Sequence, residues 1–243
     1  MSEFAAWMAV LAYPAIFILV FDWTGAGPRW AAKHKSFFPP AEITLRQEKT
    51  GRPLLLVKFV LLLLVMRALA GSGLWHVVPI ATHSRPWSVL IVAGTVGGVL
   101  MLACRRGISL LSPRAAEAEK HDYFLRGSVA LWLGVFCAGG FVEELWRAVC
   151  ITTFQENGYS AASVILLTSF CFGVAHVSGL PSRVSPGGVT AEMIIGVMLG
   201  ATFVWSGNIV APYLASVIYF TYSFFRVRGD LVHLRCCGRD DHR

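Results

Sequence analysis

The sequence has few charged residues for its length. Only 14% of its 243 residues are Asp, Glu, Lys or Arg, whereas 56% are hydrophobic. Soluble globular domains are about 25% charged. The mean hydropathy of +0.61 agrees with this shortage of charge. The composition therefore argues against a soluble domain and indicates a membrane protein.

Features of several common enzyme and binding classes are also absent from the sequence. The six cysteines form no Cys-x-x-Cys pair, and no glycine-rich phosphate loop or internal repeat occurs. These absences argue against a thioredoxin-like redox motif, a nucleotide-binding loop and a repeat protein.

Apolar segments dominate what is present. A helix needs about 20 apolar residues to cross the hydrocarbon core of a bilayer. The candidate segments cover residues 4–22, 53–70, 86–104, 128–150, 160–178, 189–206 and 208–225. The sequence therefore predicts an all-α fold, a polytopic membrane helix bundle with about seven transmembrane helices.

The net charge of +7 comes from basic residues beside the apolar segments rather than from an extended basic patch. For this reason we expect no nucleic-acid partner. The basic residues gather after segment 1, after segment 3 and after segment 7. By the positive-inside rule, one orientation places all three groups in the cytoplasm. We expect a multi-pass protein of the plasma (inner) membrane, with its N-terminus outside and its C-terminus cytoplasmic.

Three charged residues, Glu143, Glu144 and Arg147, interrupt the apolar run "GGFVEELWRAVC". Ionisable residues at membrane depth are costly and usually mark function. On a helix, either carboxylate can reach the guanidinium, because the spacings are three and four residues. If one of the two carboxylates pairs with Arg147, the other remains without this partner. The alternative is that Arg147 only neutralises the cluster, which then holds helices together.

His176 ends the next apolar segment, in "FGVAH". In an antiparallel hairpin that turns at residues 159–160, Glu143 and His176 lie at the same depth, each about 16 residues from the turn. A carboxylate facing an imidazole can activate water, although a lone His on an apolar helix is often a hydrogen-bonded packing residue. The helix carrying Glu143 then becomes long for one crossing, so we expect a break at Gly139–Gly140 that admits water.

These motifs resemble those of the CPBP family (CAAX proteases and bacteriocin-processing membrane proteins, also called the ABI family), which includes the type II CAAX prenyl endopeptidases. "EELWR", "FGVAH" and "IIGVMLGATFVWSGNIVAPYLAS" carry the resemblance. It covers about residues 128–225 and implies three parts in the chain. These are N-terminal membrane helices with basic cytoplasmic connectors (1–127), a catalytic helical core (128–225) and a basic cytoplasmic tail (226–243).

The resemblance also implies roles for individual residues. Glu143 would be the general base, His176 its partner, and Glu144 and Arg147 a structural or substrate-orienting pair. Phe172 matches the family's Phe-x-x-x-His motif. If the site holds a divalent metal such as zinc, Glu143 and His176 are the candidate ligands, but catalytic zinc usually has three protein ligands and the Arg147 charge opposes a cation.

The chain departs from the family pattern in two places. "EELWR" has two residues between the second Glu and the Arg, where the family usually has three. Ser216 stands where a second His is expected, and Tyr219 and Phe220 stand where an Asn is expected. In the family that His and Asn bind the developing oxyanion or a metal; Ser216 could supply one hydrogen bond instead.

The resemblance leads to two alternative functions, and the charges within the apolar segment lead to a third. The first is a metalloprotease-like intramembrane endopeptidase that hydrolyses a peptide bond of a membrane-associated or prenylated protein or peptide, with the lipid bilayer as its other partner. The second is a catalytically impaired relative that acts as a membrane binding partner, which the missing His and Asn favour. The third is a transporter whose path the buried charges line.

Overall fold

The computed structural model describes residues 2–23, 57–69, 85–111, 129–177 and 186–237. Within these ranges the chain forms helices and no strand, which confirms the all-α prediction. The helices are α1 (Glu3–Trp23), a helix over residues 57–69, α5 (Trp87–Leu111), α7 (Val129–Glu156), α8 (Ala161–Val177), α9 (Pro186–Ser206) and α10 (Val210–Cys237). Each of them overlaps one of the predicted apolar segments.

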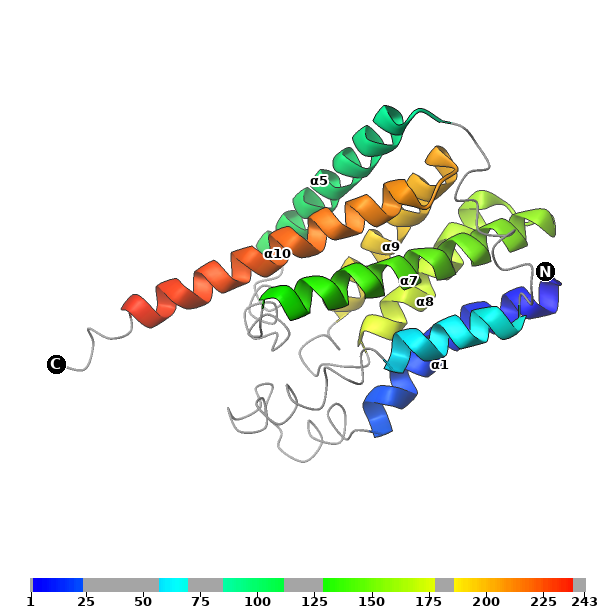
Figure 1. The fold of residues 1–243 in the computed structure, drawn as a ribbon, viewed down its shortest axis with the longest axis horizontal. Coiled ribbons are helices and arrows are strands. Elements are labelled where there is room, and N and C mark those ends of the chain that lie inside the picture. Colours follow the sequence, from blue (N-terminus) through cyan, green and yellow to red (C-terminus); the bar gives the residue numbers. More distant parts are fainter. Residues whose placement is uncertain (1, 24–56, 70–84, 112–128, 178–185, 238–243) are drawn as a thin grey trace.

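Helix α7 is the centre of the bundle. It contacts α1, α8, α9 and α10. In Figure 1 it runs between the pair formed by α1 and the cyan helix 57–69 and the pair formed by α5 and α10. Every residue from 142 to 150 is buried. The charged stretch of the sequence therefore lies inside the bundle and not on its surface.

Length and apolar composition single out one helix of the described residues as able to cross a membrane, Trp87–Ile108 in α5. The apolar stretches Glu3–Phe17, Ala161–His176 and Thr190–Ser206 are shorter. The described part of the chain thus supplies one candidate span, and the other six predicted spans are not confirmed by this test.

The predicted break at Gly139–Gly140 is wrong, because α7 is continuous from Val129 to Glu156. The glycines have a packing role instead. A Cβ atom at Gly139 would lie 2.2 Å from the ring of Phe59, and one at Gly140 would lie 3.9 Å from Ser216 Cβ. The missing side chain at Gly139 therefore lets the helix over residues 57–69 approach α7 closely.

Glycines also set the distance between α5 and α10. A Cβ atom at Gly94 would lie 2.7 Å from the backbone oxygen of Ala211, and one at Gly98 would lie 2.9 Å from Ile218. Small residues four apart on a helix face allow such close backbone approach. The two helices therefore form a tightly packed pair.

Both helices of this pair extend beyond the predicted apolar segments. Helix α5 continues to Leu111 and α10 to Cys237. Arg105, Arg106 and Arg226 therefore lie on helices rather than in a connector or an irregular tail. The remainder of the basic connectors, in residues 24–52 and 112–127, lies outside the described residues.

Candidate active site

Glu143 and His176 face each other across the α7–α8 hairpin. Residues 157–160 join the two helices, as the sequence predicted, and Gly158 adopts a positive φ of 88° in this turn. Glu143 Oε1 lies 3.9 Å from His176 Nε2. The hairpin register predicted from the sequence therefore brings together two residues that are far apart in the chain.

The orientation of the His176 ring is fixed by a backbone contact. Nδ1 lies 3.0 Å from the carbonyl oxygen of Phe172, one turn earlier in α8. A carbonyl oxygen only accepts hydrogen bonds, so Nδ1 must be the protonated nitrogen that donates. In the neutral ring, Nε2 is then an acceptor, and this is the nitrogen on the Glu143 side.

The second carboxylate, Glu144, forms the ion pair with Arg147. The sequence allowed Arg147 to pair with either Glu143 or Glu144, and in the structure its partner is Glu144, three residues away. Ser216 Oγ of α10 donates a further hydrogen bond of 3.3 Å to Glu144 Oε1. The Ser216 hydroxyl is therefore bonded to the ion pair, whereas the resemblance had suggested that it could donate a hydrogen bond to an oxyanion.

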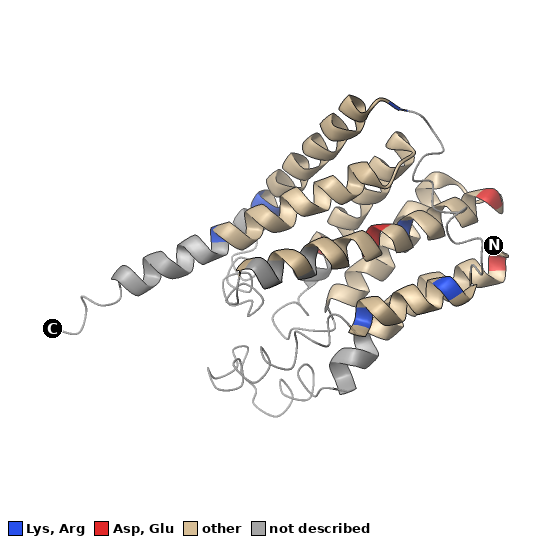
Figure 2. Ribbon diagram, in the orientation of Figure 1, with Lys and Arg blue, Asp and Glu red and all other residues tan. Residues whose placement is uncertain are grey.

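The ion pair is deeply buried, and some of its polar atoms remain without a hydrogen-bond partner. Arg147 is 0% exposed and Glu144 is 2% exposed. Among the described residues, Glu144 Oε2 and the Arg147 Nε and Nη2 atoms have no hydrogen-bond partner. Figure 2 shows red and blue segments next to each other in the middle of α7.

Phe172 links the ion pair to the histidine. The Arg147 guanidinium lies 4.8 Å from the centre of the Phe172 ring, and the His176 ring centre lies 4.1 Å from it. Cation–π contacts of this kind are favourable, more so when the cation is desolvated. One aromatic ring thus packs against both the guanidinium of the ion pair and the imidazole of His176.

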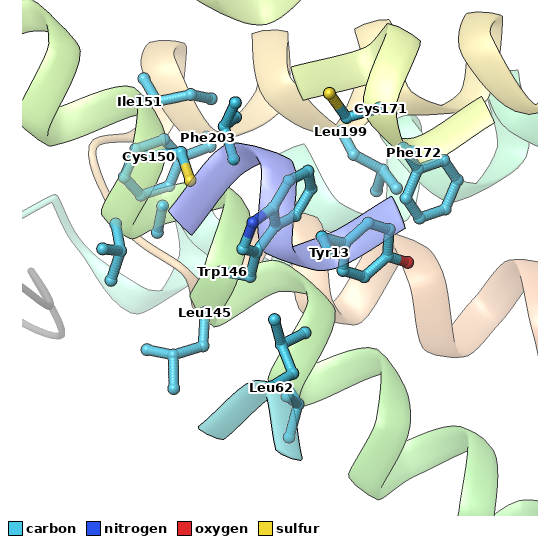
Figure 3. Packing of buried hydrophobic residues seen from close by; sticks show 14 of the residues in the cluster. Tyr13, Leu62, Leu145, Trp146, Cys150, Ile151, Cys171, Phe172, Leu199 and Phe203 are labelled. Carbon is cyan, nitrogen blue, oxygen red and sulfur yellow. The ribbon is translucent and has the colours of Figure 1, made fainter. Parts of the chain in front are cut away.

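Tyr13 of α1 joins the site, although the sequence analysis did not identify it. Its hydroxyl donates a hydrogen bond of 3.0 Å to Glu143 Oε1. Its ring stacks on Trp146 at 4.2 Å, and Figure 3 shows it between Trp146 and Phe172. Trp146 Nε1 in turn donates to the backbone oxygen of Ala9. The only signal in the sequence is a phenol hydroxyl within an otherwise apolar run.

Lys58 is a second residue that the sequence analysis passed over. It is buried, and its Nζ lies 4.4 Å from the centre of the Phe17 ring. The Phe17 ring centre lies 6.1 Å from that of His176. A lysine inside an apolar segment was the available signal. Lys58 therefore places a buried basic side chain on the α1 side of the site.

The described residues do not fit a catalytic zinc site. Such a site usually takes three protein ligands. No group of three or more His, Cys, Asp and Glu side chains in the described ranges could hold a metal ion. Glu143 and His176 supply two metal-donor groups, and the adjacent carboxylate, Glu144, is paired with Arg147.

Comparison with known protein families finds a match over the same part of the chain. A family model described as type II CAAX prenyl endopeptidase Rce1-like matches residues 125–220, less than half of the chain. No curated protein and no solved structure matches the chain significantly. The matched range contains Glu143, Glu144, Arg147, Phe172, His176 and Ser216. The part of the chain that carries the motifs is therefore similar to the type II CAAX prenyl endopeptidases, one of the groups that the motifs indicated.

Proposed function

We propose that this protein is an intramembrane endopeptidase in which Glu143 and His176 activate the attacking water. The observation that carries the proposal is the 3.9 Å separation between Glu143 Oε1 and His176 Nε2. This distance is too long for a direct hydrogen bond, which is about 3 Å, but it suits two groups that share one water molecule.

The hydrogen-bonding capacities of the two groups favour attack by that water. The Glu143 carboxylate and His176 Nε2 are both acceptors, so the water donates to both and keeps its lone pairs for the substrate. Its oxygen attacks the carbonyl carbon of the scissile peptide bond as Glu143 takes the proton. The tetrahedral intermediate then collapses, the C–N bond breaks, and Glu143 returns the proton to the leaving amine.

The neighbouring residues hold these two groups in position. Tyr13 donates to the same oxygen of Glu143 that faces His176, so it fixes the carboxylate on that side. Glu144 and Arg147 neutralise each other, which leaves Glu143 as the carboxylate available for proton transfer. We assign Tyr13, Glu144, Arg147 and Phe172 as positioning residues.

We further propose a polytopic membrane location, with the N-terminus outside and the C-terminus in the cytoplasm of the plasma membrane. The distribution of side chains supports it. Large apolar residues are exposed on outer helix faces, whereas Lys58, Glu143, Glu144, Arg147 and Glu192 are buried. A soluble protein shows the reverse arrangement. The substrate class that suits this location is a membrane-associated protein or peptide, including a prenylated one.

A second candidate function is a catalytically impaired relative that binds a membrane partner. The hydroxyl of Ser216, which stands in place of a histidine, donates to Glu144, and Tyr219 is a buried part of the apolar core. Loss of one oxyanion donor typically lowers the rate by about 10²–10³. A binding protein would tolerate that loss, whereas a peptidase needs another donor.

Cleavage of a prenylated peptide by purified protein in liposomes distinguishes the two functions. We expect slow turnover by the natural protein and a loss of about 10²–10⁴ in kcat/KM for Glu143→Gln, the size of a general-base contribution. Glu156→Gln is the matched control, because Glu156 is an exposed residue at the end of the same helix. No turnover by any of the three proteins, or equal turnover by all three, would exclude the peptidase assignment.

A further inference from the structure

A separate pocket lies where α5 packs against α10, at the end of α5 that carries arginines. Its volume is about 370 Å³. The lining residues are Leu102, Arg105, Arg106, Tyr222, Ser223 and Arg226. None of them belongs to the candidate active site. Figure 2 shows the basic segments of α5 and α10 at the same end of this helix pair.

Positive charge predominates in this pocket. Arg105 has an acidic partner, Glu192 of α9, with 3.6 Å between Nη1 and Oε1. Within the described ranges, no ion pair joins a carboxylate to Arg106 or Arg226. The pocket therefore holds three guanidinium groups, and among the described residues a carboxylate pairs with Arg105 but not with Arg106 or Arg226. A bound anion would relieve the mutual repulsion of these groups.

The pocket is preformed by packing rather than by charge pairing. The close contacts of Gly94 and Gly98 hold α5 against α10. This packing keeps the two arginines of α5 beside the one on α10 despite their like charge. Guanidinium groups bind phosphate through paired, parallel hydrogen bonds, and the hydroxyls of Tyr222 and Ser223 offer further donors.

The position of the pocket along α5 indicates the source of the phosphate. The apolar stretch that can cross a membrane is Trp87–Ile108, so Arg105 and Arg106 lie at its end. Exposed apolar side chains cover the preceding turns of α5, among them Val96, Val99 and Leu100. A phospholipid places acyl chains beside such a surface and its phosphate at the level of the arginines.

We propose that this pocket binds the phosphate group of an anionic phospholipid from the leaflet at the Arg105 end of α5. The inference rests on the proposed membrane location and not on the proposed peptidase activity. Lipid binding can therefore be measured in the Glu143→Gln protein as well, so that failure of one proposal is distinguishable from failure of the other.

The test is native mass spectrometry of the full chain in neutral detergent, titrated with phosphatidylglycerol or with phosphatidylcholine of the same acyl chains. We expect tighter binding of phosphatidylglycerol and a loss of about tenfold or more in the double variant Arg106→Gln/Arg226→Gln. The matched control is Arg85→Gln, because this exposed arginine lies before the opposite end of α5 and over the Trp205 ring. Its phosphatidylglycerol affinity should be unchanged.

Two further measurements distinguish guanidinium binding from charge alone, and a phospholipid from soluble phosphate. The variant Arg106→Lys/Arg226→Lys keeps the charge but loses the planar fork, so we expect an intermediate affinity. Millimolar inorganic phosphate should displace little lipid; full displacement would assign the pocket to a soluble phosphate and overturn the lipid source. Equal phosphatidylglycerol binding by the natural protein and the double glutamine variant, or an equal loss in Arg85→Gln, would overturn the proposal.

Discussion

At the scale of single residues, the site separates two adjacent carboxylates by their partners. Glu144 is bonded to Arg147 and Ser216, whereas Glu143 is bonded to Tyr13 and faces His176. Neighbouring residues on a helix point about 100° apart, so the two side chains meet different helices. The same residue type is therefore structural at one position and available for chemistry at the next.

The contact between Tyr13 and Glu143 predicts a kinetic effect without loss of the fold. The variant Tyr13→Phe keeps the ring that stacks on Trp146 and removes only the hydroxyl. A net hydrogen bond contributes about 1 kcal/mol, or roughly a fivefold change in rate. We expect kcat to fall by about that factor while KM and the melting temperature change little.

The control for this prediction is Tyr159→Phe. Tyr159 also donates to a glutamate, Glu3, but it lies exposed in the α7–α8 turn, outside the site. We expect unchanged kcat for Tyr159→Phe. Equal effects of the two substitutions on kcat would show that the hydroxyl of Tyr13 does not position Glu143.

At the scale of helices, close backbone contacts set the architecture. Gly94 and Gly98 join α5 to α10, Gly139 admits Phe59, and a Cβ atom at Gly196 would lie 2.9 Å from the Cα of Ser169 in α8. Gly139 and Gly140 had suggested a helix break because glycine weakens helices. The sequence could not distinguish a break from a close contact, since that difference depends on which helix packs there.

A stability measurement tests the contact between α5 and α10. In Gly94→Ala the new methyl group would overlap the backbone of Ala211, which cannot turn aside. Overpacking of this kind costs about 1–3 kcal/mol, or roughly 2–12 °C in melting temperature for a chain of this size. Gly107→Ala is the control on the same helix, because nothing lies within 4 Å of its Cβ position. A loss of stability in the control equal to that in Gly94→Ala would contradict the contact.

At the scale of the whole molecule, the sequence predicted the helices and the part of the site that α7 and α8 form. The apolar segments located the helices, and the hairpin register placed Glu143 level with His176. Tyr13 and Lys58 were missed because their approach to α7 and α8 comes from packing between segments more than eighty residues apart. Local periodicity carries no information about such contacts, which only the folded chain reveals.

The overall arrangement also predicts the topology. Tyr159 in the α7–α8 turn donates to Glu3 near the N-terminus, so both lie on one face of the bundle. In a background without the native cysteines, Ser2→Cys and Asn157→Cys should react with a membrane-impermeant maleimide applied from outside. Gly107→Cys, beside the basic end of α5, should react only after permeabilisation. Labelling of Gly107→Cys in intact cells would contradict the proposed orientation.

The most direct test of the central claim is a double-mutant cycle on Glu143 and His176, measured as kcat/KM for peptide cleavage. If both residues act on one water molecule, each single variant, Glu143→Gln or His176→Ala, loses most of the rate. The double variant should then be no slower than the slower single variant. Rate losses that multiply in the double variant, or a single variant that cleaves at the natural rate, would contradict a shared water between the two side chains.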